Sequence, residues 1–198
     1  MSAPDAVGFV AAGGRSRRMG RDKALLPWGG GTLLDHAVAR LRAVSSEVRV
    51  LSGSEARYGD RGLPVDLDSE PEAGPLAGLA AALAVAAPRP ALLLAVDMPF
   101  VTRELLRGLR DALPGWDAVV PATDAGPEPL CAAYAAACLE PVRAALAAGE
   151  RKMTAFWGGV RVRMLAGADL DRFGDPDRLF RNLNHPSDYA AAGEGRPR

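Results

Sequence analysis

The apolar positions of the chain alternate between short continuous runs and longer stretches with helical spacing. Residues 6–12 (AVGFVAA) are almost entirely apolar, and such a short run is typical of a strand buried on both faces. Residues 91–96 (ALLLAV) form a second run of this kind, closed by Asp97. Five further strands are predicted at 48–51, 63–67, 117–121, 130–134 and 160–165. Polar and apolar residues alternate in the last of these, which indicates an edge strand.

The longer stretches predict helices between these strands. Thr32 is a suitable N-cap for a helix through residue 44, with Leu33, Ala37, Val38 and Leu41 at helical spacing. Further helices are predicted at 76–87, where Pro88 follows, and at 102–113, 139–148 and 188–192.

Alternating strands and helices favour an α/β fold with a mostly parallel sheet covered on both faces. No linker or repeat divides residues 1–192, so we expect a single domain there and a loose tail at 193–198. Ligands of such sheets bind beyond the carboxyl ends of the central strands. This rule directs attention to the loop after residue 12 and the turn after residue 96.

Composition narrows the function classes. The 198 residues contain 24 Lys and Arg against 24 Asp and Glu, so no global basic field favours nucleic acid. Every apolar run is shorter than a membrane span, and the first residues lack the basic start of a secretory signal. Cys131 and Cys138 match no metal or redox spacing, which indicates a reducing cytoplasm. We therefore expect a cytoplasmic protein without nucleic-acid or membrane partners.

The loop after the first strand is rich in glycine and positive charge. Gly13 and Gly14 allow a tight turn whose N–H groups can face an anion. Five cations follow within nine residues: Arg15, Arg17, Arg18, Arg21 and Lys23. Backbone donors beside cations suit a triphosphate, although the spacing is neither GxxxxGK[ST] nor GxGxxG. The alternative interpretation is a solvated basic turn.

Two carboxylates stand at predicted strand ends. Asp97 is placed to hold Mg²⁺, a cation that prefers oxygen ligands and bridges phosphates. The alternative is a carboxylate that caps a turn or the helix after it. Asp68 follows the strand predicted at 63–67, and its acidic neighbours also fit a solvated turn.

Four motifs occur together in order: AAGGRSRRMGRDKALL, GPLAGL at 74–79, DMPF at 97–100 and NLNHPSDY at 182–189. This combination resembles the molybdenum cofactor guanylyltransferases of the nucleotidyltransferase superfamily, over nearly the whole chain. The resemblance implies a Rossmann-like three-layer sandwich of the nucleotide-diphospho-sugar transferase type. It also implies transfer of GMP from GTP to molybdopterin cofactor with Mg²⁺ and release of pyrophosphate. Transient cofactor-delivery proteins are further possible partners.

The resemblance also implies roles for individual residues. Lys23, assisted by Arg18, would stabilise the phosphates, and Asp97 would bind both nucleotide and metal. Asn182 and Asn184 match a segment on the molybdopterin side. The remaining predicted nucleotide-binding residues are Ala11, Ala12, Gly13, Gly14, Ser52, Asp68 and Gly78.

Two departures from the family pattern concern nucleotide recognition. Ala11 replaces a leucine, which removes an apolar contact but keeps the backbone donors. Ser52 lies where the family often has an asparagine, and a hydroxyl cannot reproduce the bidentate geometry of an amide. Two alternatives therefore stay open: another nucleotidyltransferase, using CTP or acting on a sugar or alcohol phosphate, and a non-catalytic binding module.

Overall fold

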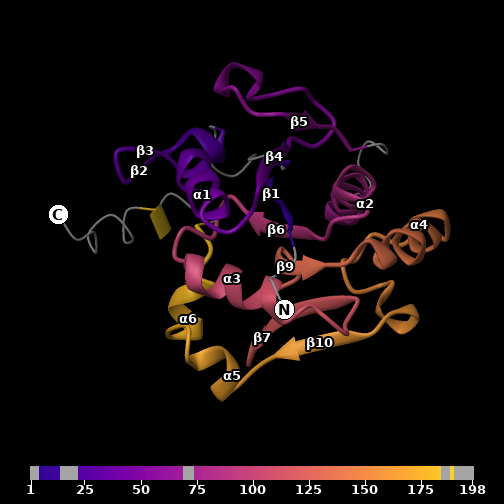
Figure 1. Cartoon of the computed structure of the whole chain (residues 1–198). Coiled ribbons are helices and arrows are strands. Elements are labelled where there is room, and N and C mark those ends of the chain that lie inside the picture. Colours follow the sequence, from indigo (N-terminus) through magenta and orange to yellow (C-terminus); the bar gives the residue numbers. More distant parts are fainter. Residues whose placement is uncertain (1–4, 14–21, 69–73, 184–187, 190–198) are drawn as a thin grey trace.

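The computed structural model describes residues 5–13, 22–68, 74–183 and 188–189. Its main sheet has the strand order β10-β7-β9-β6-β1-β4-β5, and β8 pairs with β7 (Figure 1). Every pair along this order is parallel except the two that involve β9. The strands are β1 (Val7–Ala11), β4 (Glu47–Leu51), β5 (Val65–Asp66), β6 (Ala91–Ala95), β7 (Ala118–Thr123), β8 (Gly126–Pro127), β9 (Cys131–Tyr134) and β10 (Val162–Leu165).

The mostly parallel sheet and its edge strand β10 confirm two predictions from the sequence. The opposite direction of β9 was not predicted, because an apolar run looks the same in either direction. Its cause is the short connection from β7, which contains only β8 and two short turns. A parallel neighbour would need a crossover of a dozen or more residues, so the chain folds back antiparallel instead.

Helices cover both faces of the sheet, with α1 and α3 on one side and α2 and α4 on the other (Figure 1). Two apolar clusters result. Alternate residues of the central strands enter opposite clusters: Val10 and Leu94 pack with α1 and α3, whereas Phe9 and Leu93 pack with α2 and α4. The four helices are α1 (Leu33–Arg42), α2 (Pro75–Ala86), α3 (Arg103–Asp111) and α4 (Leu139–Ala147).

Shorter elements complete the fold. A hairpin of β2 (Pro27–Trp28) and β3 (Gly31–Thr32) precedes α1, and α5 (Ala168–Asp171) and α6 (Pro176–Leu179) follow β10. Four 3-10 turns are η1 (Lys23–Leu25), η2 (Gly59–Arg61), η3 (Ala136–Cys138) and η4 (Trp157–Gly159). These elements are two to four residues long, which is too short for a periodic pattern of apolar residues, and they were not predicted from the sequence.

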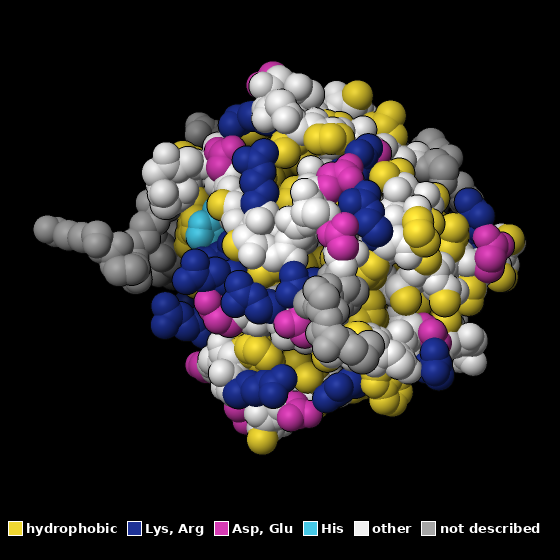
Figure 2. Space-filling view, in the orientation of Figure 1, with side chains coloured by type: hydrophobic (Ala, Val, Ile, Leu, Met, Phe, Trp, Pro, Cys, Tyr) yellow, Lys and Arg dark blue, Asp and Glu magenta, His cyan; other side chains and the backbone are white. Residues whose placement is uncertain are grey.

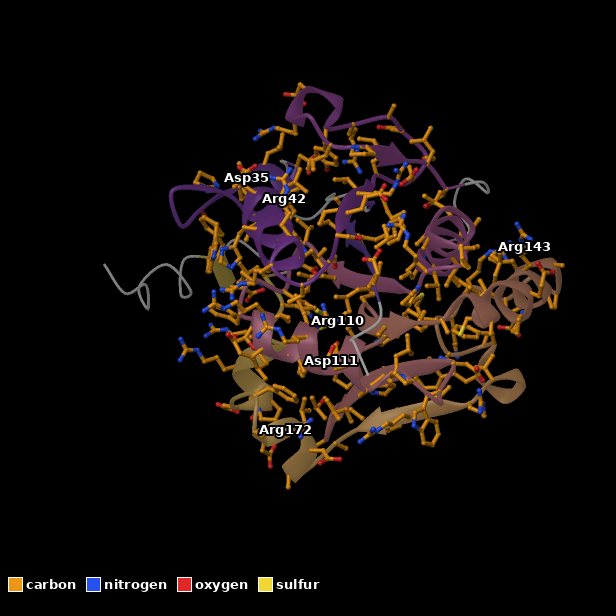
Figure 3. All side chains as sticks on the ribbon, viewed as in Figure 1. Asp35, Arg42, Arg110, Asp111, Arg143 and Arg172 are labelled. Atoms are coloured by element: carbon orange, nitrogen blue, oxygen red, sulfur yellow. The ribbon has the colours of Figure 1, made fainter. Side chains whose placement is uncertain are left out.

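Thr32 caps α1 as predicted. Its hydroxyl accepts from the Asp35 N–H at 3.2 Å, and Asp35 Oδ2 accepts from the Thr32 N–H at 2.9 Å. Figure 3 shows Asp35 near the start of α1 and Arg42 on the same helix, in its last turn. The acidic side chain in the first turn and the basic side chain in the last turn interact favourably with the helix dipole and stabilise α1.

The surface carries mixed charge. On the face shown in Figure 2, Lys and Arg side chains are interspersed with Asp and Glu, in line with the balanced composition. Within the described residues, no helix combines the length and apolarity required to cross a bilayer. Cys131 and Cys138 are both buried with free thiols, one in each apolar cluster. The predicted tail 193–198 and most of the helical piece 188–192 lie outside the described residues.

Candidate functional site

The site is at the edge of the sheet where β1, β4, β5 and β6 end and where the antiparallel β9 begins. Hydrogen bonds extend the sheet one residue past these ends. The Ala12 N–H donates to Leu51 O at 2.9 Å, and the Val96 N–H donates to Ala11 O at 3.1 Å. The loops after β1 and β6 are therefore anchored to the neighbouring strand at their first residue. This anchoring keeps the two loops close together.

Lys23 and Asp97 form an ion pair, with Nζ and Oδ2 2.9 Å apart. Lys23 lies on η1, and Asp97 follows β6. Their side chains are only 15% and 23% exposed, so water screens the pair less than it screens a surface pair. Two residues predicted separately to act on a nucleotide are thus brought into direct contact.

The backbone of Asp97 also anchors the C-terminal segment, because its carbonyl accepts from the Leu183 N–H at 3.0 Å. Asn182 is consequently held next to the turn that carries Asp97. The Oδ1 atom of Asn182 is buried and has no hydrogen-bond partner among the described residues.

Glu128 is a site residue that sequence reasoning missed. Leu94 pairs with Cys131 in the antiparallel ladder, and the Ala95 N–H donates to Leu130 O at 2.8 Å. The chain turns just before this ladder, where the Cys131 N–H donates to Glu128 O, and Glu128 lies close enough to Asp97 for the two charges to interact. Burial and the nearby charge of Asp97 raise the pKa of the Glu128 carboxyl above its usual range. A glutamate just before an apolar run was the only signal in the sequence.

The loops after β1 and β4 approach each other closely at two glycines. A Cβ atom on Gly13 would lie 2.5 Å from the Gly53 nitrogen, so only glycine fits at Gly13 without a shift of the backbone. Gly53 has φ +78°, a conformation that also favours glycine. This contact fixes the backbone N–H groups that the sequence predicted for nucleotide binding.

The side chains of Asp22, Arg57 and Tyr58 also support these loops, and no sequence pattern pointed to them. Arg57 and Tyr58 both bind the Asp22 carboxylate, at 3.1 Å from Arg57 Nη1 and at 2.8 and 2.9 Å from the Tyr58 hydroxyl. Burial and the Asp22 carboxylate raise the pKa of Tyr58, so its hydroxyl remains a donor.

Asp68 and Gly78 also meet. The Asp68 N–H donates to Gly53 O at 2.9 Å, and a Cβ on Gly78 would lie 3.3 Å from Asp68 Oδ1. The Asp68 carboxylate is half-buried, and burial raises its pKa. Among the described residues, no donor forms a hydrogen bond with this side chain, and burial is the cause of its raised pKa.

Ser52 is 1% exposed, and its hydroxyl donates to Glu55 O at 2.6 Å. Its hydroxyl proton is therefore engaged within the loop, and nucleotide binding by Ser52 stays a prediction. Ala11, Ala12 and Gly13 lie at the end of β1 as expected. Gly14, Arg18 and Asn184 fall outside the described residues, as do Arg15, Arg17 and Arg21.

The chain is similar to several known proteins over most of its length. The family model of the MobA-like NTP transferase domain matches residues 8–162. A probable molybdenum cofactor guanylyltransferase of Pelotomaculum thermopropionicum is 37% identical over 94% of this chain and 91% of its own. A molybdenum cofactor guanylyltransferase of Cereibacter sphaeroides is 39% identical over 93% and 94%. The crystal structure of molybdopterin-guanine dinucleotide biosynthesis protein A from Archaeoglobus fulgidus superposes with TM-score 0.81 at 26% identity, covering 95% and 97%.

Proposed function

The chain belongs to the MobA-like NTP transferase family, and from this premise we propose that it transfers GMP from GTP to molybdopterin cofactor. Pyrophosphate is the second product. The observation that carries the proposal is the Lys23–Asp97 pair beside the Gly13–Gly53 contact. It supports the proposal because an ammonium, a carboxylate suited to a metal ion and closely held backbone N–H groups lie at one edge of the sheet.

The reaction needs positioning and charge neutralisation more than proton transfer. The terminal phosphate of molybdopterin is an anion that attacks the α-phosphorus of GTP, while pyrophosphate leaves in line. Lys23 neutralises the α-phosphate and the departing pyrophosphate. The backbone N–H groups after β1 orient the triphosphate. Holding both anionic substrates in one complex lowers the entropic cost of bringing them together.

The acidic residues fit a divalent cation, and we assign Mg²⁺. Asp97 and Glu128 offer hard oxygen ligands, and Mg²⁺ sites often use one or two carboxylates with substrate phosphates. The residues described in the structure contain no group of three or more His, Cys, Asp or Glu arranged around a metal. Bound there, Mg²⁺ would neutralise phosphate charge. Asp97 would hold it, and Lys23 would turn from Asp97 to the phosphates.

We assign guanine recognition to Asp68, whose half-buried carboxylate lies against Gly78. Guanine presents N1–H and an exocyclic amine as adjacent donors, and one carboxylate can accept from both. Cytosine lacks this pair of donors, so the same carboxylate favours GTP over CTP.

The proposal also covers the second substrate and the setting. We assign Asn182 to the molybdopterin side, together with Asn184, which lies beyond the described residues. The assignment is supported by the buried Asn182 Oδ1 atom, which has no hydrogen-bond partner among the described residues and belongs to the segment anchored on Asp97. We further propose one nucleotidyltransferase domain at 1–192 with a tail at 193–198. We also propose a cytoplasmic location, and the two free buried thiols are compatible with a reducing compartment. Transient contact with cofactor-delivery proteins is the last part of the proposal.

The deciding experiment incubates the protein with molybdenum-loaded molybdopterin and each Mg-nucleotide, followed by pyrophosphate detection and mass analysis of the product. GTP is expected to give the guanine dinucleotide and one pyrophosphate per transfer. Asp97→Asn should abolish both signals, whereas Asp111→Asn, at the exposed end of α3, should leave them intact. Nucleotide binding without pyrophosphate release would refute the proposed function, and equal turnover of CTP would refute the assignment of guanine.

A further inference from the structure

The guanidinium of Arg57 connects three separate segments at the sheet edge. Its Nη2 atom donates to Ala12 O at 3.2 Å and to Ser52 O at 3.0 Å, which are the first residues after β1 and β4. Its Nη1 atom donates to Asp22 Oδ2 at 3.1 Å. One planar group thus holds the two nucleotide loops and the start of η1 in fixed relation.

Asp22 transmits this constraint to Lys23. Its Oδ1 atom accepts from the Ala24 N–H at 3.1 Å and thereby caps η1, the turn that carries Lys23. The Tyr58 hydroxyl donates to the same carboxylate and fixes its orientation. The backbone of Lys23 is therefore tied to the position of Arg57 through a single carboxylate.

The position of Arg57 is not the one that would give the highest free energy of unfolding. Its Nε atom is buried and has no partner among the described residues, and a buried unpaired donor is unfavourable. A lysine would have one nitrogen in place of the fork that reaches Asp22 and both carbonyls at once. The requirement at this position is therefore a geometric one.

We propose that Arg57 is a positioning residue for nucleotidyl transfer, and that it acts through Asp22. Together they keep the N–H groups after Ala12 and the Lys23 ammonium in the relative position that a single triphosphate requires. This inference rests on the proposed function, because it assigns both loops and Lys23 to the same nucleotide.

The test compares Arg57→Lys with the matched control Arg49→Lys. Arg49 makes an ion pair of similar burial, with Nε and Nη2 at 2.7 and 2.8 Å from Asp66, but among the described residues it makes no hydrogen bond to Ala12, Ser52 or Asp22. For each variant, calorimetry gives the Kd for GTP, pyrophosphate release gives kcat and KM, and thermal unfolding gives Tm.

Arg57→Lys should raise both the Kd and the KM for GTP by about tenfold or more, the effect of losing charge-assisted hydrogen bonds. Arg49→Lys should lower Tm with kcat/KM unchanged. Asp22→Asn keeps the side-chain volume and the Oδ1 acceptor for the Ala24 N–H, but it puts an amide NH2 opposite Arg57 Nη1, so it should mainly lower kcat by uncoupling the turn of Lys23 from Arg57. Adding Arg57→Lys to Asp22→Asn should then cost less than the product of the two separate effects.

A purely structural role would reduce Tm in both arginine variants and leave their GTP kinetics equal, and that result overturns the inference. If Arg57→Lys does not fold, wild-type kcat and KM in Asp22→Asn overturn it equally. GTP calorimetry requires no acceptor. Tight wild-type binding without pyrophosphate release would therefore reject the proposed function, while weaker GTP binding by Arg57→Lys would still show that Arg57 holds the nucleotide loops in place.

Discussion

Gly13→Ala tests whether the approach of the two glycine loops is required for activity. The added methyl group would lie 2.5 Å from Gly53 N, 2.8 Å from Gly53 Cα and 3.1 Å from Ser52 C. All three atoms belong to the backbone, which cannot move aside as the end of a flexible side chain can. The loops after β1 and β4 must therefore separate.

The size of the effect follows from the geometry. An ordinary contact begins at 3.4 Å, so the loops must move apart by nearly 1 Å. Arg57 Nη2 now reaches Ala12 O at 3.2 Å and Ser52 O at 3.0 Å, and an added 1 Å breaks at least one of these bonds. Overpacking of this kind costs about 1–3 kcal/mol of unfolding free energy. Misplacing reacting groups by about 1 Å reduces catalysis by roughly 10²-fold.

The assay is steady-state pyrophosphate release with GTP and molybdopterin, together with thermal unfolding. Gly13→Ala should lower kcat/KM by roughly 10²-fold and Tm by about 2–10 °C. Gly59→Ala is the matched control, because a Cβ there meets no atom within 4 Å, and both parameters should stay close to wild type. Wild-type kcat/KM in Gly13→Ala would show that the close approach does not position the nucleotide.

Three further predictions concern single side chains. Lys23→Ala should lower kcat for pyrophosphate release by roughly 10²–10³-fold, and near-normal turnover would exclude its assigned role. Asp68→Asn should reduce the preference for GTP over CTP by about tenfold in competition assays. The same variant should raise Tm at pH 7. Burial raises the pKa of Asp68 in the folded state, so the free energy of unfolding falls as pH rises above the usual carboxyl pKa of 3.8. A neutral amide at this position avoids that loss. Cys131 and Cys138 should resist a thiol reagent at pH 8 until denaturant is added, because burial raises both pKa values, that of Cys138 to about 12; rapid native labelling would contradict this.

The sequence predicted the main strands and helices because their apolar periods are strong and their ends are marked. Residues 91–96 were expected as a buried strand, and β6 (Ala91–Ala95) has no exposed residue. Asp97 and the loop of Lys23 were both placed at the carboxyl edge by the general rule for parallel sheets. That rule brings the two regions together but does not specify the ion pair between them.

Glu128 and Arg57 were missed because their contacts join segments that are far apart in the sequence, and no local sequence pattern predicts such contacts. Glu128 comes near Asp97 at the turn that enters β9, and the antiparallel direction of β9 follows from a short connection rather than from apolar spacing. Arg57 acquires its role through two backbone carbonyls, and any residue type supplies a carbonyl. Such contacts become visible only when the chain path is known.

The Lys23–Asp97 ion pair has a consequence for how the two ligands depend on each other. A metal ion that binds Asp97 alone costs Lys23 its ion pair, and a nucleotide that binds Lys23 alone costs Asp97 the same ion pair. When both arrive, each charge exchanges one opposite partner for another. The affinities for cation and nucleotide should therefore be linked, each ligand tightening the other by the same factor. The pair thus disfavours half-filled states of the site.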